Sequence, residues 1–294
     1  MQGQYTYLFY IADVTLAITI EHEVIISDRF RPFLVEGKEY DYQAVFLECD
    51  TLPYVSGEMV SHNISFDIYQ NSDGKSWGIF RDAMREDSPY AVSTYNWEHK
   101  MVTVRYLRKK GEIFRRIENC FFHIAWETMI TRKGRLILHS SCVDTAFGGI
   151  LFSGPSGIGK STQSELWCIH EGAKLLNGDR PILQRRDEQW NAYGSPYAGS
   201  SKCHINDRCR VRAIVVLRQG EQCSIRRLYG LEAFRNIFAE LTVSTWDFFC
   251  VETACTLAEK LVCEVPVYEL HATLEQSAVT LLKSVLQEEM LDEH

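Results

Sequence analysis

The chain has 294 residues, of which 46% are hydrophobic and 24% are charged, a balance typical of a globular protein with a sizeable core. This composition excludes a disordered chain, a collagen-like repeat and a small disulfide-stapled scaffold. The 31 Lys and Arg residues against 39 Asp and Glu residues give a formal charge of -8. The overall field therefore repels polyanions, and no nucleic-acid partner is expected.

The sequence shows none of the patterns typical of a membrane span or a signal peptide. Its longest uncharged run, 145–159, is rich in Gly and Ser, and the apolar patch 7–11 follows no basic region. The 10 cysteines are scattered and include no C-x-x-C pair. We therefore expect a cytoplasmic protein with reduced thiols and no membrane partner. The sequence leaves the oligomeric state open, a homo-oligomer included.

Residues 1–110 are predicted to form a β-rich antiparallel subdomain. Apolar residues alternate with others over 14–21, and similar runs occur over 66–68 and 101–106. Turn-forming residues interrupt these runs at 71–74 and 87–89.

The spacing of apolar residues then changes over 111–134, and this segment is predicted to be a linking helix. Apolar residues recur three or four positions apart at Ile113, Ile117, Phe121 and Ile124, the spacing of a helical face. Gly134 is expected to end this helix.

From 135 to 294 the pattern mixes strands and helices, so the chain is predicted to be a mixed α/β protein. Strands are expected over 136–139, 149–152, 175–176, 212–217 and 266–270. Helices are expected over 160–171, 231–241, 244–263 and 275–290. The first of these should end at Gly172, and the third should begin with Ser244 as its N-cap.

The most informative segment is Gly154-Pro155-Ser156-Gly157-Ile158-Gly159-Lys160-Ser161, a full match to the G-x-x-x-x-G-K-S phosphate loop. It follows an expected strand and opens an expected helix, which is the context that the motif requires. Glycines let backbone N–H groups surround a phosphate, the lysine neutralises the β and γ oxygens, and the serine can bind Mg²⁺. We therefore expect ATP and Mg²⁺ as ligands. The candidate nucleotide-binding residues are Gly154, Ser156, Gly157, Ile158, Gly159, Lys160, Ser161 and Thr162.

The acidic residue that should accompany this loop lies unusually near it. A mechanical ATPase would carry four apolar residues ending in Asp well downstream, but the candidate strand 213–217 ends in Arg218. An Asn-Lys-x-Asp motif for guanine is also missing. Instead the segment 173–180 reaches Asp179 about one helix after the loop. A buried strand ending in a carboxylate favours a metal or acid–base role for this residue.

These motifs resemble the HPr kinase/phosphorylase family, whose phosphate-loop core is akin to phosphoenolpyruvate carboxykinase. The resemblance rests on the order of 138–139, 154–161 and 175–179, and it covers 136–200 strongly. Within that family the chain is most similar to the smaller kinase-like proteins found beside peptide-modifying genes, and the segment 194–202 is similar to part of them. The resemblance implies a phosphate-loop kinase core and a serine on a peptide or small protein as the acceptor.

The resemblance also implies roles for single residues. His139 matches the family's active-site histidine, and Asp179 matches one of its two adjacent carboxylates. Lys160, His139 and Asp179 are therefore the expected catalytic residues. Ser161 and Asp179 are the expected metal ligands. The chain departs from the family at Gly178, where the first carboxylate would stand, and at Ser140, where the family usually has Gly. The downstream signature for recognising HPr is missing, so HPr is not the expected substrate.

Further basic residues could contact the substrate. Arg180 and Lys202 are the candidates to hold phosphate oxygens. The basic run over 105–116 could dock an acidic peptide, although a solvated face is the favoured interpretation.

Two functions remain open at this point. The first is an ATP-dependent kinase that transfers the γ-phosphate to a hydroxyl. The second is a pseudo-kinase that binds ATP without catalysis and presents a peptide to a modifying enzyme.

Overall fold

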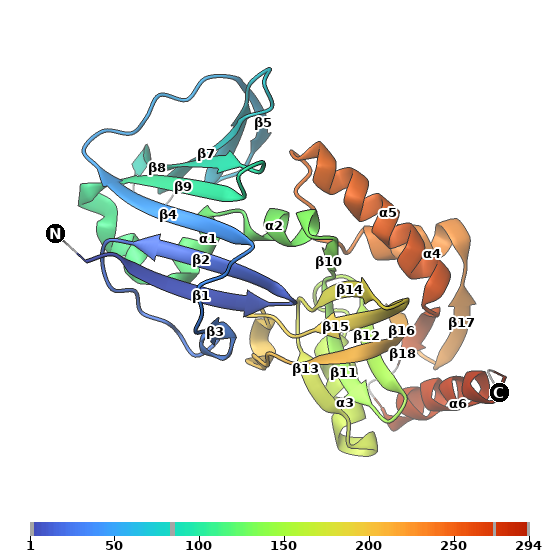
Figure 1. Ribbon diagram of the computed structural model, residues 1–294. Coiled ribbons are helices and arrows are strands. Elements are labelled where there is room, and N and C mark those ends of the chain that lie inside the picture. Colours follow the sequence, from blue (N-terminus) through green and yellow to red (C-terminus); the bar gives the residue numbers. More distant parts are fainter. Residues whose placement is uncertain (1–2, 83–85, 273–274, 293–294) are drawn as a thin grey trace. The chain divides into compact units, whose positions relative to one another are not determined.

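The structure, a computed structural model, describes residues 3–82, 86–272 and 275–292. The chain forms two units, the first made of Met1–Met129 with Ser244–Phe248 and the second of Ile130–Val243 with Phe249–His294. Each unit contains a large sheet, so the prediction of a mixed α/β protein is confirmed (Figure 1). The division falls inside the segment that was predicted to link the two parts.

Unit 1 consists of one sheet and short helices. Its strands are β1 (Tyr5–Ile11), β2 (Val14–Ile20), β3 (Leu34–Val35), β4 (Tyr42–Cys49), β5 (Glu58–His62), β6 (Phe66–Gln70), β7 (Ser76–Asp82), β8 (Glu86–Asn96) and β9 (Met101–Leu107). Its helices are the 3-10 helices η1 (Arg31–Phe33) and η2 (Arg108–Arg115) and the α-helix α1 (Ile117–His123), while α2 (Trp126–Arg132) crosses the boundary between the units.

The unit 1 sheet has the order β3-β1-β2-β4-β9-β8-β7-β6-β5 and is mostly antiparallel, as predicted. Two pairs correct that prediction, because β2 with β4 and β4 with β9 run parallel. The long connection from β2 to β4, which includes η1 and β3, lets the chain cross back before β4 begins. The break expected at 87–89 is also wrong, because these residues belong to β8, where the register shifts beside Pro89.

The segment 111–134, expected to be one helix, consists of the end of η2 followed by α1 and α2. Ala125 has a φ of 51°, a left-handed conformation that a continuous α-helix cannot contain. Gly134, with a φ of 76°, follows the last helical turn as expected. Two arginines of the basic run over 105–116 form ion pairs on the surface: Arg108 with Glu48, and Arg115 with Glu112.

Aromatic side chains fill the core of unit 1. Phe30 and Phe121 are fully buried, with ring centroids 4.6 Å apart. His123, at the end of α1, lies in the same core, where its Nε2 is 3.0 Å from the Tyr90 hydroxyl and its ring centroid is 4.7 Å from that of Phe114. Burial lowers the pKa of His123 to about 4.

Unit 2 alternates strands and helices. Its strands are β10 (Arg135–Ile137), β11 (Ser140–Thr145), β12 (Gly148–Ser153), β13 (Lys174–Asn177), β14 (Ile182–Arg186), β15 (Gln189–Tyr193), β16 (Arg208–Gln219), β17 (Ser224–Leu228) and β18 (Val267–Ala272). Its helices are α3 (Lys160–Glu171), the 3-10 helix η3 (Gly199–Ser201), α4 (Gly230–Phe238), α5 (Phe248–Glu264) and α6 (Gln276–Asp292).

The unit 2 sheet is mixed, with the order β10-β14-β15-β16-β12-β11-β13 and with β18 and β17 beside the second half of β16. β12 runs parallel to β16, which runs parallel to β18. These three strands connect through helices, as parallel strands require.

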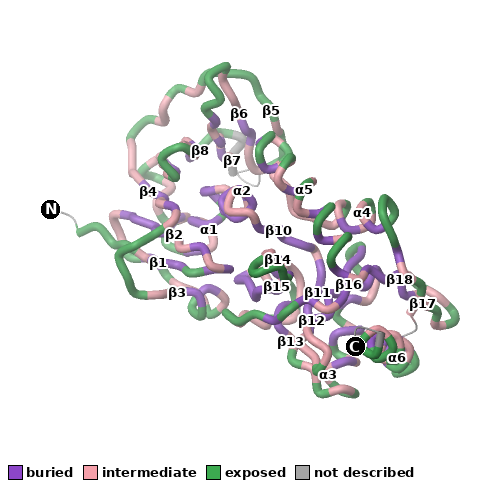
Figure 2. The backbone as a smooth tube through the Cα atoms, turned by 45° about the vertical axis from the view of Figure 1, so that its right-hand side comes forward, coloured by how far each residue is buried: buried purple, intermediate pink, exposed green. Residues whose placement is uncertain are grey.

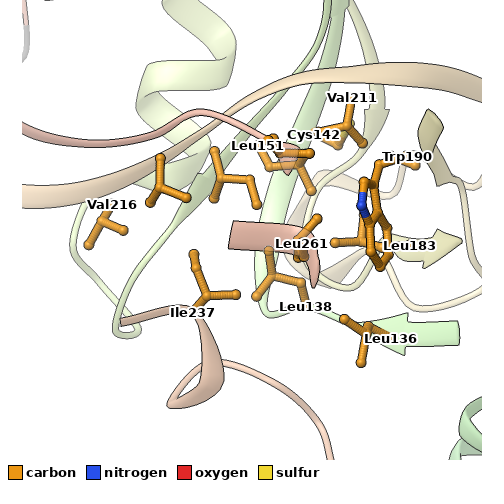
Figure 3. Packing of buried hydrophobic residues seen from close by; sticks show 14 of the residues in the cluster. Leu136, Leu138, Cys142, Leu151, Leu183, Trp190, Val211, Val216, Ile237 and Leu261 are labelled. Carbon is orange, nitrogen blue, oxygen red and sulfur yellow. The ribbon is translucent and has the colours of Figure 1, made fainter. Parts of the chain in front are cut away.

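Helices cover both faces of this sheet. Alternate residues of β16 point to opposite faces, so Val216 packs with α4 and α5 while Val215 packs with α3 and α6. Figure 3 shows the first cluster, in which Leu138, Ile237 and Leu261 meet. The central strands are accordingly buried along most of their length (Figure 2).

The observed boundaries of α3 and α5 can be compared with the boundaries that the sequence predicts. α3 spans the predicted residues and ends at Gly172, whose φ is 64° and whose N–H donates to the carbonyl of Trp167. The predicted start of α5 at Ser244 is wrong, because the helix begins at Phe248. The Ser244 hydroxyl instead hydrogen-bonds that of Thr128 at 2.7 Å, so it does not cap the helix. None of the helices in the described part of the chain is long and apolar enough to cross a membrane.

The burial of His123 predicts a pH-dependent stability for unit 1. Its folded pKa of about 4 lies below the ordinary value of 6.5, so between these values the unfolded chain binds more protons than the folded chain. The free energy of unfolding should therefore fall as the pH drops from 6.5 toward 4, by up to about 3 kcal/mol. Urea unfolding of wild type and His123→Gln at pH 7 and pH 5 measures this.

In His123→Gln the difference between the two pH values should shrink, although the variant is less stable at both. His99→Gln is the matched control, because His99 is exposed in the same unit. An undiminished pH dependence in His123→Gln would show that other groups cause it.

Candidate functional site

Strand pairing brings three loops to one edge of the unit 2 sheet. β11 runs antiparallel to β12, with Ser140 opposite Ser153, and antiparallel to β13, with Cys142 opposite Asn177. Antiparallel strands start where their neighbours end. The residue before β11, the loop after β12 and the turn after β13 therefore meet at this edge, and these segments carry the histidine, the glycine-rich loop and the carboxylate expected from the sequence.

The loop between β12 and α3, which we call the 154–161 loop, depends on glycine backbone geometry. Gly154, Gly157 and Gly159 have φ values of 140°, 81° and 112°, which side-chain-bearing residues rarely adopt. A Cβ on Gly154 would also approach the Leu217 carbonyl to 3.4 Å. The loop thus bends sharply before α3 begins at Lys160, and the first N–H groups of this helix remain available to an anion.

Lys160 lies at the base of the site with its side chain folded back along the loop. The residue is only 8% exposed, and its Nζ donates hydrogen bonds to the carbonyls of Gly154 at 2.7 Å and Pro155 at 3.1 Å. Burial lowers the pKa of the Lys160 ammonium, while the carboxylates of Glu240 and Asp179 raise it. Burial has the larger effect, so the pKa of Lys160 is lowered overall.

A histidine between two carboxylates also lines the site. The Nδ1 of His139 lies 2.9 Å from Oε2 of Glu240, and its Nε2 lies 3.4 Å from Oδ1 of Asp179. Because an ionised carboxylate only accepts hydrogen bonds, the short contact assigns the proton to Nδ1. Nε2 then faces Asp179 and the open side of the site.

Backbone and amide groups hold Asp179 in place. The Asn177 side-chain oxygen accepts the N–H groups of Asp179 at 3.0 Å and Arg180 at 2.8 Å. The amide of Asn177 in turn donates to Ser195. On the other side, the Ser140 N–H donates to the Asp179 carbonyl at 2.9 Å. The turn after β13 is therefore fixed to the start of β11.

These groups surround a cavity of about 390 Å³, which we call the loop cavity. Its lining residues are His139, Ser156, Gly157, Gly159, Lys160, Ser161, Thr162, Gly178, Asp179, Gly199 and Ser200. Most of the residues expected from the sequence thus share one cavity. Gly154 lies behind the loop against β16, and Ile158 packs against the hydrophobic cluster beneath α3.

The two expected substrate-contacting residues lie outside this lining. Arg180 is directed to Asp179, at 3.5 Å, and to the Thr242 hydroxyl, at 2.9 Å. Lys202 is exposed just after η3, with a φ of 54°. A contact of either residue with a substrate stays a prediction.

Glu240 was not anticipated from the sequence. It follows α4 and is 101 positions from His139, and the two meet because Leu241 pairs with Leu138 and the His139 N–H donates to the Glu240 carbonyl at 2.8 Å. No sequence motif predicts a site residue that an isolated long-range β-bridge brings into place. Gly199 and Ser200 also line the cavity, although the sequence predicts no site role for them within the segment 194–202.

The structure gives a steric reason for glycine at 178. A Cβ at this position would lie 2.2 Å from Oγ of Ser201 and 2.9 Å from the carbonyl of Ala198, which is too close for real contacts. The segment 198–201 therefore covers Gly178 directly, and a carboxylate does not fit at this position in this arrangement.

Comparison with known proteins finds a distant likeness among solved structures. No protein-family model matches the chain, and no curated protein matches it. Among solved structures, the Hpr(Ser) kinase/phosphatase from Coxiella burnetii matches with 13% sequence identity and a TM-score of 0.34, over 54% of this chain and 99% of that one.

The crowding at Gly178 predicts a specific pattern of stability. Gly178→Ala should destabilise the protein by about 1–3 kcal/mol, because the new methyl group overlaps Ser201. Ser201→Gly in the same chain removes the nearest atoms and should recover part of that loss. Thermal unfolding of wild type, both single variants and the double variant measures the coupling.

Gly111→Ala serves as the control, because a Cβ there meets only a ring carbon of Tyr106 at 3.6 Å. Additive effects of Gly178→Ala and Ser201→Gly would show that segment 198–201 does not restrict position 178.

Proposed function

We propose that the protein is an ATP-dependent kinase that transfers the γ-phosphate to a hydroxyl group. The observation that supports this best is the sharing of one cavity by the 154–161 loop, the Lys160 cation and the His139–Asp179 pair. Such a cavity holds both parts that phosphoryl transfer requires, a cradle for phosphates and a group that accepts a proton.

The loop residues fit the phosphates of ATP. The first N–H groups of α3 and the glycine backbone offer donors, and the helix dipole adds a positive potential at the same point. Lys160 now donates to two carbonyls of its own loop, and the β and γ oxygens of ATP would accept these hydrogen bonds in their place. The buried cation then needs no large movement to meet its ligand.

The donor set also fits Mg²⁺ bound together with the nucleotide. Ser161 and Asp179 line the loop cavity and offer a hydroxyl and a carboxylate, and Mg²⁺ is usually held by one or two carboxylates together with substrate phosphates. Among the residues that the structure describes, no group of three His, Cys, Asp or Glu side chains forms a separate metal cage. When bound, Mg²⁺ would neutralise charge on the β and γ oxygens.

The His139–Asp179 pair would receive the proton of the acceptor. As the acceptor oxygen forms its bond to the γ-phosphorus, the bond from phosphorus to the β,γ-bridging oxygen breaks and ADP leaves. The acceptor proton passes to Asp179 or to Nε2 of His139, which lie 3.4 Å apart. Glu240 keeps the imidazole oriented through the 2.9 Å contact to Nδ1.

The acceptor class rests on the sequence resemblance. The motifs over 136–200 resemble those of kinase-like proteins found beside peptide-modifying genes, which supports a serine on a peptide or small protein.

A second candidate is a pseudo-kinase that binds ATP and presents a peptide to another enzyme. The glycine at 178 favours it, because this position has no carboxylate and no space for one. Binding of ATP without transfer to any peptide would support it.

The first prediction for this function concerns nucleotide affinity. Lys160→Ala removes a charged donor from the phosphates and should weaken Mg²⁺-ATP binding about 10- to 100-fold, since hydrogen bonds to charged groups contribute about 1.5–3 kcal/mol. Isothermal titration calorimetry measures this. Lys174→Ala is the control, because Lys174 pairs with Asp207 on the surface. Unchanged affinity in Lys160→Ala would mean that the loop is only a structural turn.

The second concerns transfer. Asp179→Asn keeps the shape of the side chain but removes its charge and most of its basicity, so the rate should fall by roughly 10² to 10⁴. ATP affinity should change much less, because the loop and Lys160 provide most of the contacts. Incorporation of labelled γ-phosphate into serine-containing peptides measures the rate.

Asp187→Asn is the matched control for this substitution, because Asp187 is exposed in the turn between β14 and β15. Wild-type transfer that Asp179→Asn leaves intact would remove Asp179 from the mechanism, and His139→Ala would then test the other candidate base.

A further inference from the structure

A second cavity, of about 320 Å³, adjoins the loop cavity along α3, and we call it the α3 cavity. The two share Ser161 and Gly178 among their lining residues. The full lining of the α3 cavity is Ser141, Ser161, Ser164, Glu165, Cys168, Leu175, Gly178 and Ser201. The two cavities therefore meet at Ser161 and Gly178.

Most polar groups of this lining are already engaged. Ser164 donates to the Ser141 hydroxyl at 2.6 Å, and Ser141 donates to the Lys160 carbonyl at 3.1 Å. Ser201 donates to the Ala198 carbonyl at 2.6 Å. Glu165 differs from them: it is exposed, and its carboxylate forms no hydrogen bond or ion pair with any described residue.

Helix geometry directs Glu165 toward the phosphate end. It stands four residues after Ser161 on the same face of α3, so their Cβ atoms are about 5–6 Å apart. Side chains on an α-helix lean toward its N-terminus. The Glu165 carboxylate can therefore reach the space beside the Ser161 hydroxyl.

We infer that Glu165 would supply, from α3, a second carboxylate to the hydrated Mg²⁺ of the bound nucleotide. The inference rests on the proposed function. Among the residues that line the two cavities, Asp179 and Glu165 are the carboxylates. Mg²⁺ keeps several water molecules, and carboxylates commonly hold these waters. Glu165 provides from α3 the negative charge that Gly178 cannot provide from the turn after β13.

The test measures metal binding directly. Mn²⁺ replaces Mg²⁺ as the probe, and electron paramagnetic resonance follows free Mn²⁺ in titrations of the full chain with ADP. In Glu165→Gln the Mn²⁺ concentration for half-saturation should rise about tenfold, the lower end of the range for groups that support metal ligands. ADP binding without metal, measured by calorimetry, should stay as in wild type. Glu171→Gln, on the same helix and paired with Lys283, should leave both values unchanged.

The outcomes separate this inference from the proposed function. If wild type binds no ADP with or without metal, the proposed function fails. If wild type binds Mn²⁺ with ADP and Glu165→Gln binds it equally well, the role of Glu165 is overturned and the kinase proposal stands. Metal-free ADP binding also shows whether Glu165→Gln is folded. If the variant loses this binding together with Mn²⁺ binding, Glu165 acts on folding and the inference is overturned.

Discussion

The antiparallel pairing of β11 with both β12 and β13 is the constraint on which the site depends. It fixes the start of β11 beside the ends of its two neighbours, so residues that are far apart along the chain meet at one edge of the sheet. A one-residue slip of β11 would reverse which of its side chains face each side. The buried residues on both faces of the sheet oppose such a slip. The hydrophobic core of unit 2 thus determines where the polar groups stand.

The polar groups then stabilise one another. A buried ammonium is costly unless opposite charges and hydrogen bonds surround it. Lys160 has two carbonyl partners and the nearby carboxylates of Glu240 and Asp179. The same two carboxylates flank His139. An anionic ligand in the loop cavity would lie next to the Lys160 ammonium.

Sequence patterns predicted the local parts of this arrangement well. The order of strand, glycine-rich loop and helix over 148–171 is set by residues next to one another, and the structure has each boundary close to where it was expected. Failures occur where distant contacts override local signals. Ser244 has the side chain of an N-cap, yet it hydrogen-bonds Thr128 and α5 begins later. Glu240 carries no local signal because a long-range bridge brings it to His139.

Gly178 stands where the resemblance would lead one to expect a carboxylate. If the site had only lost a carboxylate, an open space would be expected at this position. Instead Ser201 and the Ala198 carbonyl occupy it, and hydrogen bonds from the Ser201 hydroxyl to Ala198 and from the Cys203 N–H to Ser201 hold that segment in place. The surrounding chain is therefore packed around a glycine. In the proposed kinase the proton acceptor would be Asp179 or His139, and the contact of Glu240 with Nδ1 leaves Nε2 as the ring nitrogen that could take part.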